Sequence, residues 1–360
     1  MTESVRTLLI RLSQEHSLTE TEYRQLVEGY TPEAALFAQE LAVRTRQRIY
    51  GTDIFIRGLI EISNICRNDC LYCGIRRSNA HCQRYRLLPG DILACAEEGY
   101  HLGFRTIVLQ GGEDAYYTDD RLTDLIRELR RRWPDCAITL SLGERGLTSF
   151  QRLREAGADR YLLRHETADA DHYHLLHPRD CSFEHRMQCL RDLKRCGYQV
   201  GCGFMTGSPW QTAAHLARDL LFIQQFQPEM CGIGPFIPHH DTPFARFPAG
   251  SVPFTCYLLS IVRLIVPDVL LPATTALGSL HPRGQEMGIL AGANVVMPNL
   301  SPADVRSKYM LYDNKRNTGV ESAQHLQLLS ERMDEIGYHI VRDRGDVKHM
   351  TERRRASDRG

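Results

Sequence analysis

Three cysteines stand close together in one short stretch of the chain. Cys66, Cys70 and Cys73 have the spacing C-x3-C-x2-C and directly follow an apolar run. Three thiolates from one loop can bind three irons of a 4Fe–4S cube, and the fourth iron then has no protein ligand. Electron-transfer clusters are usually held by four cysteines. The spacing therefore predicts a cluster that does chemistry at an open iron.

Zinc is the alternative occupant of such a loop. A structural zinc site has four ligands, and His81 or Cys82 could supply the fourth. Zinc ribbons and fingers usually pair two short runs of ligands, however, and the sequence has no second C-x2-C and no H-x3-H run. The three-ligand iron–sulfur interpretation is favoured, and a non-catalytic zinc or iron–sulfur binding protein is the alternative from another functional class.

From residue 54 onward, short β-branched runs alternate with amphipathic stretches. The expected strands lie at 54–65, 106–111, 137–142, 160–165, 199–205, 229–236, 270–275 and 294–298. Expected helices between them include 119–132, 183–196 and 211–226. This alternation predicts βαβ units and a parallel sheet. Eight units are the number in a closed (β/α)8 barrel of the TIM type, and an open doubly wound sheet is the alternative.

Three regions are expected along the chain. Residues 1–50 are predicted to be an N-terminal helical extension that closes one end of the domain. The barrel is predicted to span 51–314. Residues 315–360 are predicted to contain one more helix, at 321–336, followed by a polar and disordered tail.

Composition excludes several kinds of partner. Lys plus Arg and Asp plus Glu number 44 each in the 360 residues, so no basic field would attract nucleic acid. No apolar run is long enough to span a membrane, and no secretory signal is visible. Twelve cysteines in such a chain indicate metal ligands and reduced thiols. We therefore expect a cytoplasmic, oxygen-sensitive protein.

A barrel demands that functional groups gather where the strands end. Mostly polar phrases stand at or just after the ends of nearly all the expected strands. They are Cys66, Gly111-Gly112-Glu113-Asp114, Ser141 with Glu144, Arg164-His165-Glu166, Pro235-Phe236, Thr274-Thr275 and Met297-Pro298-Asn299.

The cysteine loop, with Tyr72 before its last cysteine, resembles that of the radical S-adenosylmethionine (SAM) enzymes. Longer phrases resemble the HydE family of FeFe-hydrogenase maturation enzymes, in the biotin synthase-like group. They are ISNICRNDCLYCGIRRSN, TIVLQGGED, ITLSLGE, AGADRYLLRHETA, GIGPFIPHHDTP, PATTALG and ANVVMPN. The resemblance covers roughly residues 54–314. It implies a radical SAM enzyme that reductively cleaves SAM to a 5′-deoxyadenosyl radical in hydrogenase H-cluster assembly, acting on an iron–carbonyl–cyanide–cysteine precursor.

A 4Fe–4S cluster and SAM are the implied cofactors. Gly111 and Gly112 would let the backbone come close to the methionyl amino group, since glycine has no Cβ. Glu166 could accept hydrogen bonds from ribose hydroxyls, and Arg186 could pair with the SAM carboxylate. The resemblance implies that Ser141, Glu166 and Arg186 contact SAM.

A substrate must lie near the radical carbon, deeper in the barrel. Arg164 stands two residues before Glu166 on an expected strand, so both side chains should share its inward face. The resemblance implies a cavity lined by Arg164, Thr274, Thr275 and Tyr309. Met230, with Met297 and Tyr312, is expected to add apolar and phenolic groups, although barrel core is the alternative for both methionines.

Two other features are predicted not to bind metal. His239-His240-Asp241 is interpreted as a group of rim residues, because adjacent histidines on a strand or loop point apart. Some HydE proteins carry a second, peripheral iron–sulfur site near the C-terminus. No cysteine follows Cys256, so that site is expected to be absent.

Two rival enzymes share the expected barrel. Biotin synthase needs a second cluster inside the barrel, and only Cys202 and Cys231 lie on suitable strands. Methylornithine synthase remains the alternative, since it needs one cluster and a pocket for a charged amino acid. The expected partners are a small organometallic or amino-acid substrate, an electron donor such as ferredoxin or flavodoxin, and companion maturases.

Overall fold

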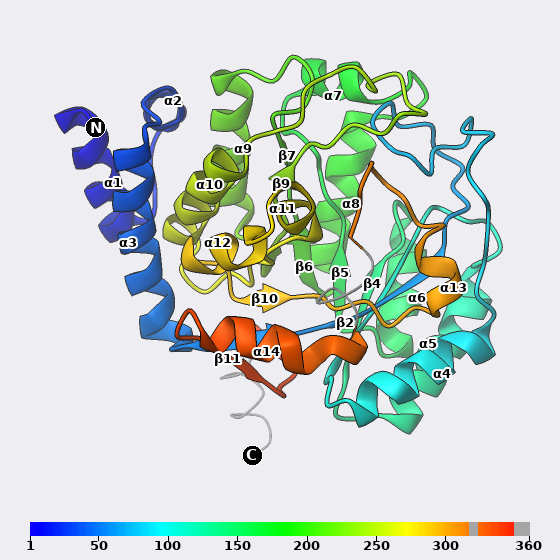
Figure 1. Cartoon of the computed structure of the whole chain (residues 1–360). Helices are drawn as coiled ribbons and strands as arrows, with labels where there is room; N and C mark the ends of the chain where they lie inside the picture. The colour runs from blue at the N-terminus through cyan, green and yellow to red at the C-terminus, as the bar shows by residue number, and fades with distance from the viewer. Residues whose placement is uncertain (317–322, 349–360) are drawn as a thin grey trace.

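Six parallel strands form one sheet at the centre of the computed structural model, which describes residues 1–316 and 323–348 (Figure 1). In order across the sheet they are β2 (Gly58–Ser63), β3 (Thr106–Gly111), β4 (Ala137–Ser141), β5 (Arg160–Leu162), β6 (Gln199–Cys202) and β8 (Met230–Cys231). A second sheet has the order β10 (Val295–Val296), β1 (Asp53–Ile56), β11 (His339–Val341). The short strands β7 (Met205–Thr206) and β9 (Gly234–Pro235) pair with each other.

Isolated backbone pairings close these strands into a ring. They join Met230 to Leu270, Pro272 to Val295, and Leu59 to Asn299. Because β1 and β2 are separated by a single residue, the pairings of β10 with β1 and of Asn299 with β2 complete eight strand positions. The predicted (β/α)8 barrel is confirmed. The strand expected at 270–275 consists only of isolated pairings, and α11 already begins at Thr275.

Helices surround the barrel. They are α4 (Pro89–His101), α5 (Asp119–Arg132), α6 (Leu147–Ala156), α7 (Ala170–Leu176), α8 (Phe183–Arg195), α9 (Ala213–Phe226), α10 (Val252–Ile265), α11 (Thr275–Leu280), α12 (Gly284–Leu290), α13 (Ala303–Arg306) and α14 (Leu326–Asp334). Helix α5 has the predicted bounds. Thr118 caps its N-terminus by accepting the Arg121 N–H, and its last turn carries three arginines that favour the negative end of the helix dipole.

The N-terminal helices α1 (Glu3–Glu15), α2 (Glu20–Glu28) and α3 (Pro32–Tyr50) pack on the side of the barrel, against α9 and α10 (Figure 1). Tyr23 donates to Gln224 Oε1 at 2.5 Å, and Tyr257 donates to the Leu26 carbonyl at 3.0 Å. Helix α10 is buried at nearly every position. One face packs on the barrel, and the N-terminal helices cover the other face. The prediction that this extension closes one end of the domain is therefore wrong.

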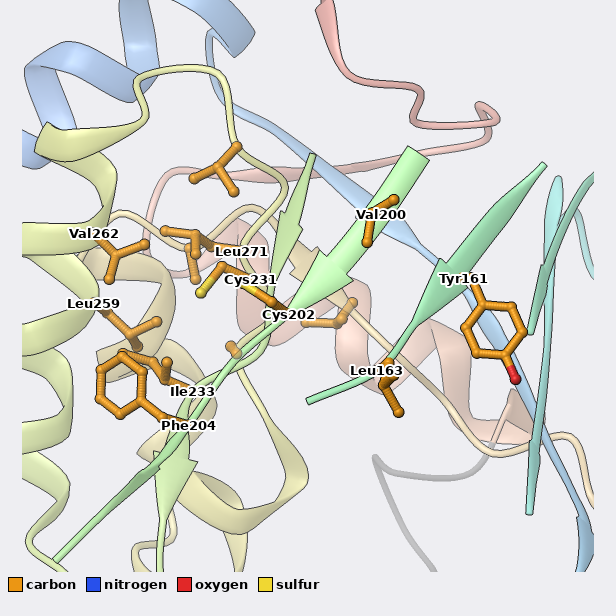
Figure 2. Close-up of a cluster of buried hydrophobic side chains, with 14 of the residues drawn as sticks. Tyr161, Leu163, Val200, Cys202, Phe204, Cys231, Ile233, Leu259, Val262 and Leu271 are labelled. Atoms are coloured by element: carbon orange, nitrogen blue, oxygen red, sulfur yellow. The ribbon is translucent and has the colours of Figure 1, made fainter. Parts of the chain in front are cut away.

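Figure 2 shows the apolar layer between the barrel strands and α10. Cys202 and Cys231 lie in this layer beside Leu259 and Val262 of α10, and both cysteines are fully buried. Neither thiol lines the central cavity described below. These cysteines fill apolar space between sheet and helix, as small apolar residues do.

The segment after β11 closes the N-terminal end of the barrel. The Arg344 carbonyl accepts hydrogen bonds from Thr106 and Arg160, both at 2.7 Å. Asp346 accepts from Arg160 at 2.6 Å and from Gln199 at 2.8 Å. Burial alone would raise the pKa of Asp346, but Arg160 and Arg344 hold it below its usual value. This contribution to stability is present above about pH 4 and is lost as pH falls further.

We expect Asp346→Asn to lower the free energy of unfolding by about 3 kcal/mol, because Arg160 is fully buried and loses its carboxylate. Chemical denaturation monitored by circular dichroism measures the change. Asp124→Asn, at an exposed position of α5, is the control and should cost less than about 0.5 kcal/mol. Equal losses in the two variants would contradict a buried ion pair at this end of the barrel.

The C-terminal region differs from its prediction. Helix α14 lies within the expected range 321–336, and residues 317–322 fall outside the described part. The strand β11 and the closing segment after it were not predicted. The tail expected to be disordered, 349–360, also lies outside the described residues. Among the described residues, no helix combines the length and the apolar character needed to cross a membrane.

Candidate active site

A cavity of about 340 Å³ lies at the C-terminal end of the barrel strands. It collects nearly all the residues for which chemistry was predicted. They are Cys66, Cys70, Cys73, Gly111, Gly112, Ser141, Arg164, Glu166, Arg186, Thr274, Thr275, Tyr309, Met297 and Tyr312. The prediction that one mouth gathers these side chains is confirmed.

The three cysteines lie on the loop after β2, which has no regular secondary structure and is held by arginines. Arg84 donates to the carbonyls of Asn64, Ile75 and Arg76 at 2.6–2.8 Å. Arg76 donates two hydrogen bonds to Asp69 within the loop, both at 2.8 Å. These contacts satisfy backbone groups that an irregular segment would otherwise leave unpaired.

Burial raises the pKa of all three cysteine thiols, to about 12 for Cys73. Neighbouring thiols raise the pKa values of Cys70 and Cys73 further, because each thiolate would form next to another sulfur. A bound metal centre reverses this penalty, since coordinated thiols are deprotonated. Three soft sulfur ligands converging on one wall of a cavity fit three irons of a cluster and leave its cavity side accessible.

Gly112 is packed against the cysteine loop. A Cβ at this position would lie 2.4 Å from the Ile65 carbonyl oxygen and 2.7 Å from Cys66 Cβ. The Gly112 N–H also donates to the Ser63 carbonyl at 2.9 Å. The next N–H, that of Glu113, donates to Cys66 Sγ at 3.4 Å. The close contact with the cluster loop therefore requires glycine here, whereas a contact with SAM stays a prediction.

Arg164 and Glu166 both line the cavity, but not for the predicted reason. Strand β5 ends at Leu162, so the two residues lie beyond it and strand alternation does not place them. Glu166 has φ of 66°, a left-handed conformation that is unusual for glutamate. Its N–H donates to the Gly203 carbonyl at 3.0 Å, which holds this conformation. Backbone strain of this kind is typical of functional sites.

The polar ends of these two side chains are incompletely paired. Arg164 Nη2 lies 3.1 Å from Glu166 Oε2. Among the described residues, however, Arg164 Nε and Nη2 and Glu166 Oε2 have no hydrogen-bond partner although they are buried. Buried polar atoms without partners are costly. A polar ligand in the cavity would satisfy them.

Arg186 reaches the cavity wall from α8. It donates to the Arg164 carbonyl at 2.7 Å and pairs with Glu144. Glu144 therefore already occupies part of the guanidinium that was predicted to pair with the SAM carboxylate. Arg186 thus links the segment after β4, through Glu144, to the segment after β5, through Arg164.

Thr274 and Thr275 stand at the start of α11. Thr274 is the residue before the helix, and its Oγ1 is buried without a hydrogen-bond partner in the described structure. Both threonines were expected at the end of a strand. They nevertheless reach the cavity, because the chain turns into α11 at this point.

A buried charged group forms the floor of the cavity, and it was not predicted. Lys315 Nζ lies 2.5 Å from Glu61 Oε1 and donates to the Tyr309 carbonyl at 3.0 Å. Asn299 donates to Glu61 Oε2 at 2.9 Å, and Gln110 Nε2 lies 3.5 Å from the Tyr309 hydroxyl. A glutamate inside the apolar run LIEIS was the available sequence signal for this group.

Sequence comparisons identify the family to which this chain belongs. The model of the radical SAM superfamily matches residues 60–223. The [FeFe] hydrogenase maturase subunit HydE of Thermotoga maritima is 42% identical over 318 residues, which cover 88% of this chain and 90% of the relative. The chain belongs to the HydE family of radical SAM enzymes. It is thus a HydE-like maturase whose family uses a 4Fe–4S cluster and SAM.

Relatives of this HydE-family chain include enzymes with other activities. The 3-methylornithine synthase of Methanosarcina acetivorans is 29% identical over 266 residues, covering 73% of this chain and 74% of the relative. The solved structure of methylornithine synthase (PylB) has a TM-score of 0.79 at 24% identity and covers 93% of this chain and 97% of that one. The second comparison supports the fold alone.

One predicted site residue of the HydE-like chain needs correction. Met230 does not line the cavity. Its sulfur accepts a hydrogen bond from Arg57 at 2.9 Å, and it packs with Phe55 and Leu270 toward the other end of the barrel. The barrel-core alternative is correct for this methionine, whereas Met297 does line the cavity. Cys202 and Cys231 face α10 (Figure 2), so they cannot hold the second barrel cluster that biotin synthase needs.

The second correction concerns His239 and His240. Their rings stack, with centroids 4.4 Å apart and planes inclined by 19°. The expectation that adjacent histidines point apart is wrong here, because this segment is an irregular loop in which side chains do not alternate.

Proposed function

We propose that this HydE-family enzyme acts on an iron–carbonyl–cyanide–cysteine precursor in assembly of the hydrogenase H-cluster. The arrangement of the cavity is the observation that supports this proposal. Three thiols stand at one wall, and polar atoms without partners, on Arg164, Glu166 and Thr274, stand at other walls. Such a cavity suits two ligands, one held at the cluster and one deeper in the barrel.

The residues divide between these two ligands. When bound, a 4Fe–4S cluster and SAM supply a 5′-deoxyadenosyl radical by reductive cleavage of SAM. Ser141, Glu166 and the backbone at Gly111 and Gly112 would orient SAM, and Arg186 would fix the wall beside it. Glu166 Oε2 lies 3.1 Å from Arg164 Nη2 but has no hydrogen-bond partner among the described residues, so it can accept from hydroxyl donors.

The proposed substrate side uses the deeper residues. Among the described residues, Arg164 Nε and Nη2 and Thr274 Oγ1 have no hydrogen-bond partner. Such donors suit an anionic organometallic ligand such as a cyanide–carbonyl iron species. Tyr309 is buried, and burial raises its pKa well above the usual value, so its hydroxyl stays protonated and can donate. Thr275, Met297 and Tyr312 complete the wall.

The proposal includes protein partners. A low-potential electron donor such as ferredoxin or flavodoxin would reduce the cluster, and companion maturases would deliver the precursor and receive the product. The similarity to HydE of Thermotoga maritima supports this assignment. A cytoplasmic location stays a prediction.

The test is an anaerobic activity assay. Cluster-loaded protein with dithionite and SAM should form 5′-deoxyadenosine, and adding it to a cell-free hydrogenase maturation mixture that lacks HydE should restore hydrogen evolution. 5′-Deoxyadenosine without restored hydrogenase activity would contradict the proposed substrate. Conversion of lysine to 3-methylornithine would favour the amino-acid mutase instead.

We expect Glu166→Ala to weaken SAM binding at least tenfold while the iron content stays unchanged. A hydrogen bond to a charged group contributes about 1.5–3 kcal/mol, and tenfold in affinity corresponds to about 1.4 kcal/mol. Calorimetry on cluster-loaded protein measures the dissociation constant. Glu97→Ala, at an exposed position of α4, is the control. An unaltered SAM affinity in Glu166→Ala would remove this residue from the SAM site.

A further inference from the structure

A group of metal-ligating side chains lies outside the predicted cluster site. His239, His240 and Asp313 each offer one ligand atom, and these atoms lie within 4.8 Å of one another. The His239 side is buried, Asp313 is half-buried and His240 is exposed. The group is thus anchored on one side and open to solvent on the other, so an ion can enter.

His240 and Asp313 are already arranged like two ligands of one metal ion, with a proton between the ring nitrogen and the carboxylate in place of the ion. His240 Nδ1 lies 2.6 Å from Asp313 Oδ1, and the His240 N–H donates to the other carboxylate oxygen at 3.0 Å. Zinc binds histidine nitrogen and carboxylate oxygen at about 2.0–2.2 Å each. A cation between this nitrogen and this oxygen would need them to separate only slightly. His239 lies alongside, with its ring stacked on His240 and its Nδ1 accepting the Asp241 N–H at 3.1 Å, so its ring would have to turn out of the stack to direct Nε2 at the cation.

The carboxylate of Asp241 lies beside His240 in the position of an outer-shell hydrogen-bond acceptor. The other ring nitrogen of His240, Nε2, lies 3.3 Å from Asp241 Oδ2. Asp241 Oδ1 is in turn 2.9 Å from His81 Nδ1. Metal-binding histidines almost always donate their second N–H to such a group, which fixes the ring and strengthens the ligand. This arrangement distinguishes His240 from a histidine that is merely paired with one acid.

We propose that His239, His240 and Asp313 bind one divalent transition-metal cation at the rim of the cavity. Two imidazoles and one carboxylate suit Zn²⁺ or Fe²⁺ and leave coordination positions for water. The site uses none of the three cysteines, although it borders their loop, and it goes beyond the function proposed above.

The position of this site indicates that a bound cation would stabilise the cavity mouth. Asp313 N–H donates to the Pro238 carbonyl at 3.0 Å, and Gly74 N–H donates to the Leu311 carbonyl at 2.8 Å. His239 also packs on Gly74, where a Cβ would lie 2.3 Å from the His239 ring. Three segments of the cavity mouth therefore meet here: the cysteine loop, the loop after β9 and residues 309–313. A cation would join them and stabilise the mouth.

The experiment is a titration of cluster-loaded protein with Co²⁺ under anaerobic conditions. Wild-type protein should bind one Co²⁺ beyond the cluster, with visible d–d bands and without thiolate-to-cobalt charge transfer. His240→Ala and Asp313→Asn should each weaken binding at least tenfold. Asp241→Asn, which changes only the outer carboxylate, should weaken it about tenfold. Unchanged cluster absorption shows that each variant remains folded and loaded.

His339→Ala is the matched control. His339 also pairs with a carboxylate, Asp334, at 2.7 Å, and it is exposed on the far side of the barrel at β11. This variant should bind Co²⁺ like the wild type. The proposal fails if wild-type protein binds no Co²⁺ beyond the cluster, or if His240→Ala and Asp313→Asn bind it as tightly as His339→Ala does.

Discussion

Cys70→Ser is expected to abolish cluster assembly and SAM cleavage. A cube held by three thiolates loses one of only three protein ligands, and a serine hydroxyl is a poor ligand for iron–sulfur clusters because it is harder and seldom deprotonated. Cys70 lies at the cavity wall with the other two thiols. Iron and sulfide content after anaerobic reconstitution, and 5′-deoxyadenosine formed with dithionite and SAM, measure the two losses.

Cys82→Ser is the informative control for this variant. Cys82 lies near the loop, where it accepts a hydrogen bond from Asn64 Nδ2 at 3.5 Å, and it was the candidate fourth ligand of a zinc site. We expect Cys82→Ser to keep a full complement of iron and its activity. Loss of metal in Cys82→Ser equal to that in Cys70→Ser would indicate a four-ligand site.

Gly112→Ala is expected to reduce cluster content and SAM cleavage at least severalfold. The added Cβ would meet the Ile65 carbonyl oxygen at 2.4 Å and Cys66 Cβ at 2.7 Å. Both belong to the cysteine loop, and backbone cannot move aside as the end of a flexible side chain can. Overpacking of this kind costs about 1–3 kcal/mol, and here the displaced atoms carry a cluster ligand. Iron content per chain after reconstitution measures the effect.

Gly90→Ala is the matched control. Gly90 lies in the first turn of α4, and a Cβ added there would meet no heavy atom within 4 Å. Because alanine is the better helix former, this variant should be at least as stable as the wild type and fully loaded. Equal cluster content in Gly112→Ala and Gly90→Ala would show that the contact with the loop is not important.

Local sequence signals predicted the barrel and the cysteine loop, whereas the resemblance to the HydE family supplied most of the other cavity residues. Helix 119–132 was predictable to the residue because capping, dipole and apolar periodicity agree there. The strand at 106–111 was equally clear. Residues at or shortly after strand ends, such as Ser141 and Cys66, were placed correctly, since barrel geometry brings every strand end to one mouth.

Side-chain direction in short or irregular segments was not predictable from local signals. Met230 faces the end of the barrel opposite the cavity. This direction was not predictable, because β8 is only two residues long and its alternation cannot be read from the sequence. His239 and His240 stack because their loop does not alternate. The Glu61–Lys315 pair joins residues 254 apart, and no local pattern reports such a contact. The closing segment around Asp346 was missed for the same reason.

Catalysis in this barrel depends on an iron that the protein leaves open. The most direct test is the electron paramagnetic resonance spectrum of dithionite-reduced, cluster-loaded protein recorded with and without SAM. We expect a 4Fe–4S signal that changes on addition of SAM, because SAM would bind the iron that Cys66, Cys70 and Cys73 leave without a ligand. A cluster signal that stays the same at saturating SAM, or a centre with four protein ligands, would contradict it.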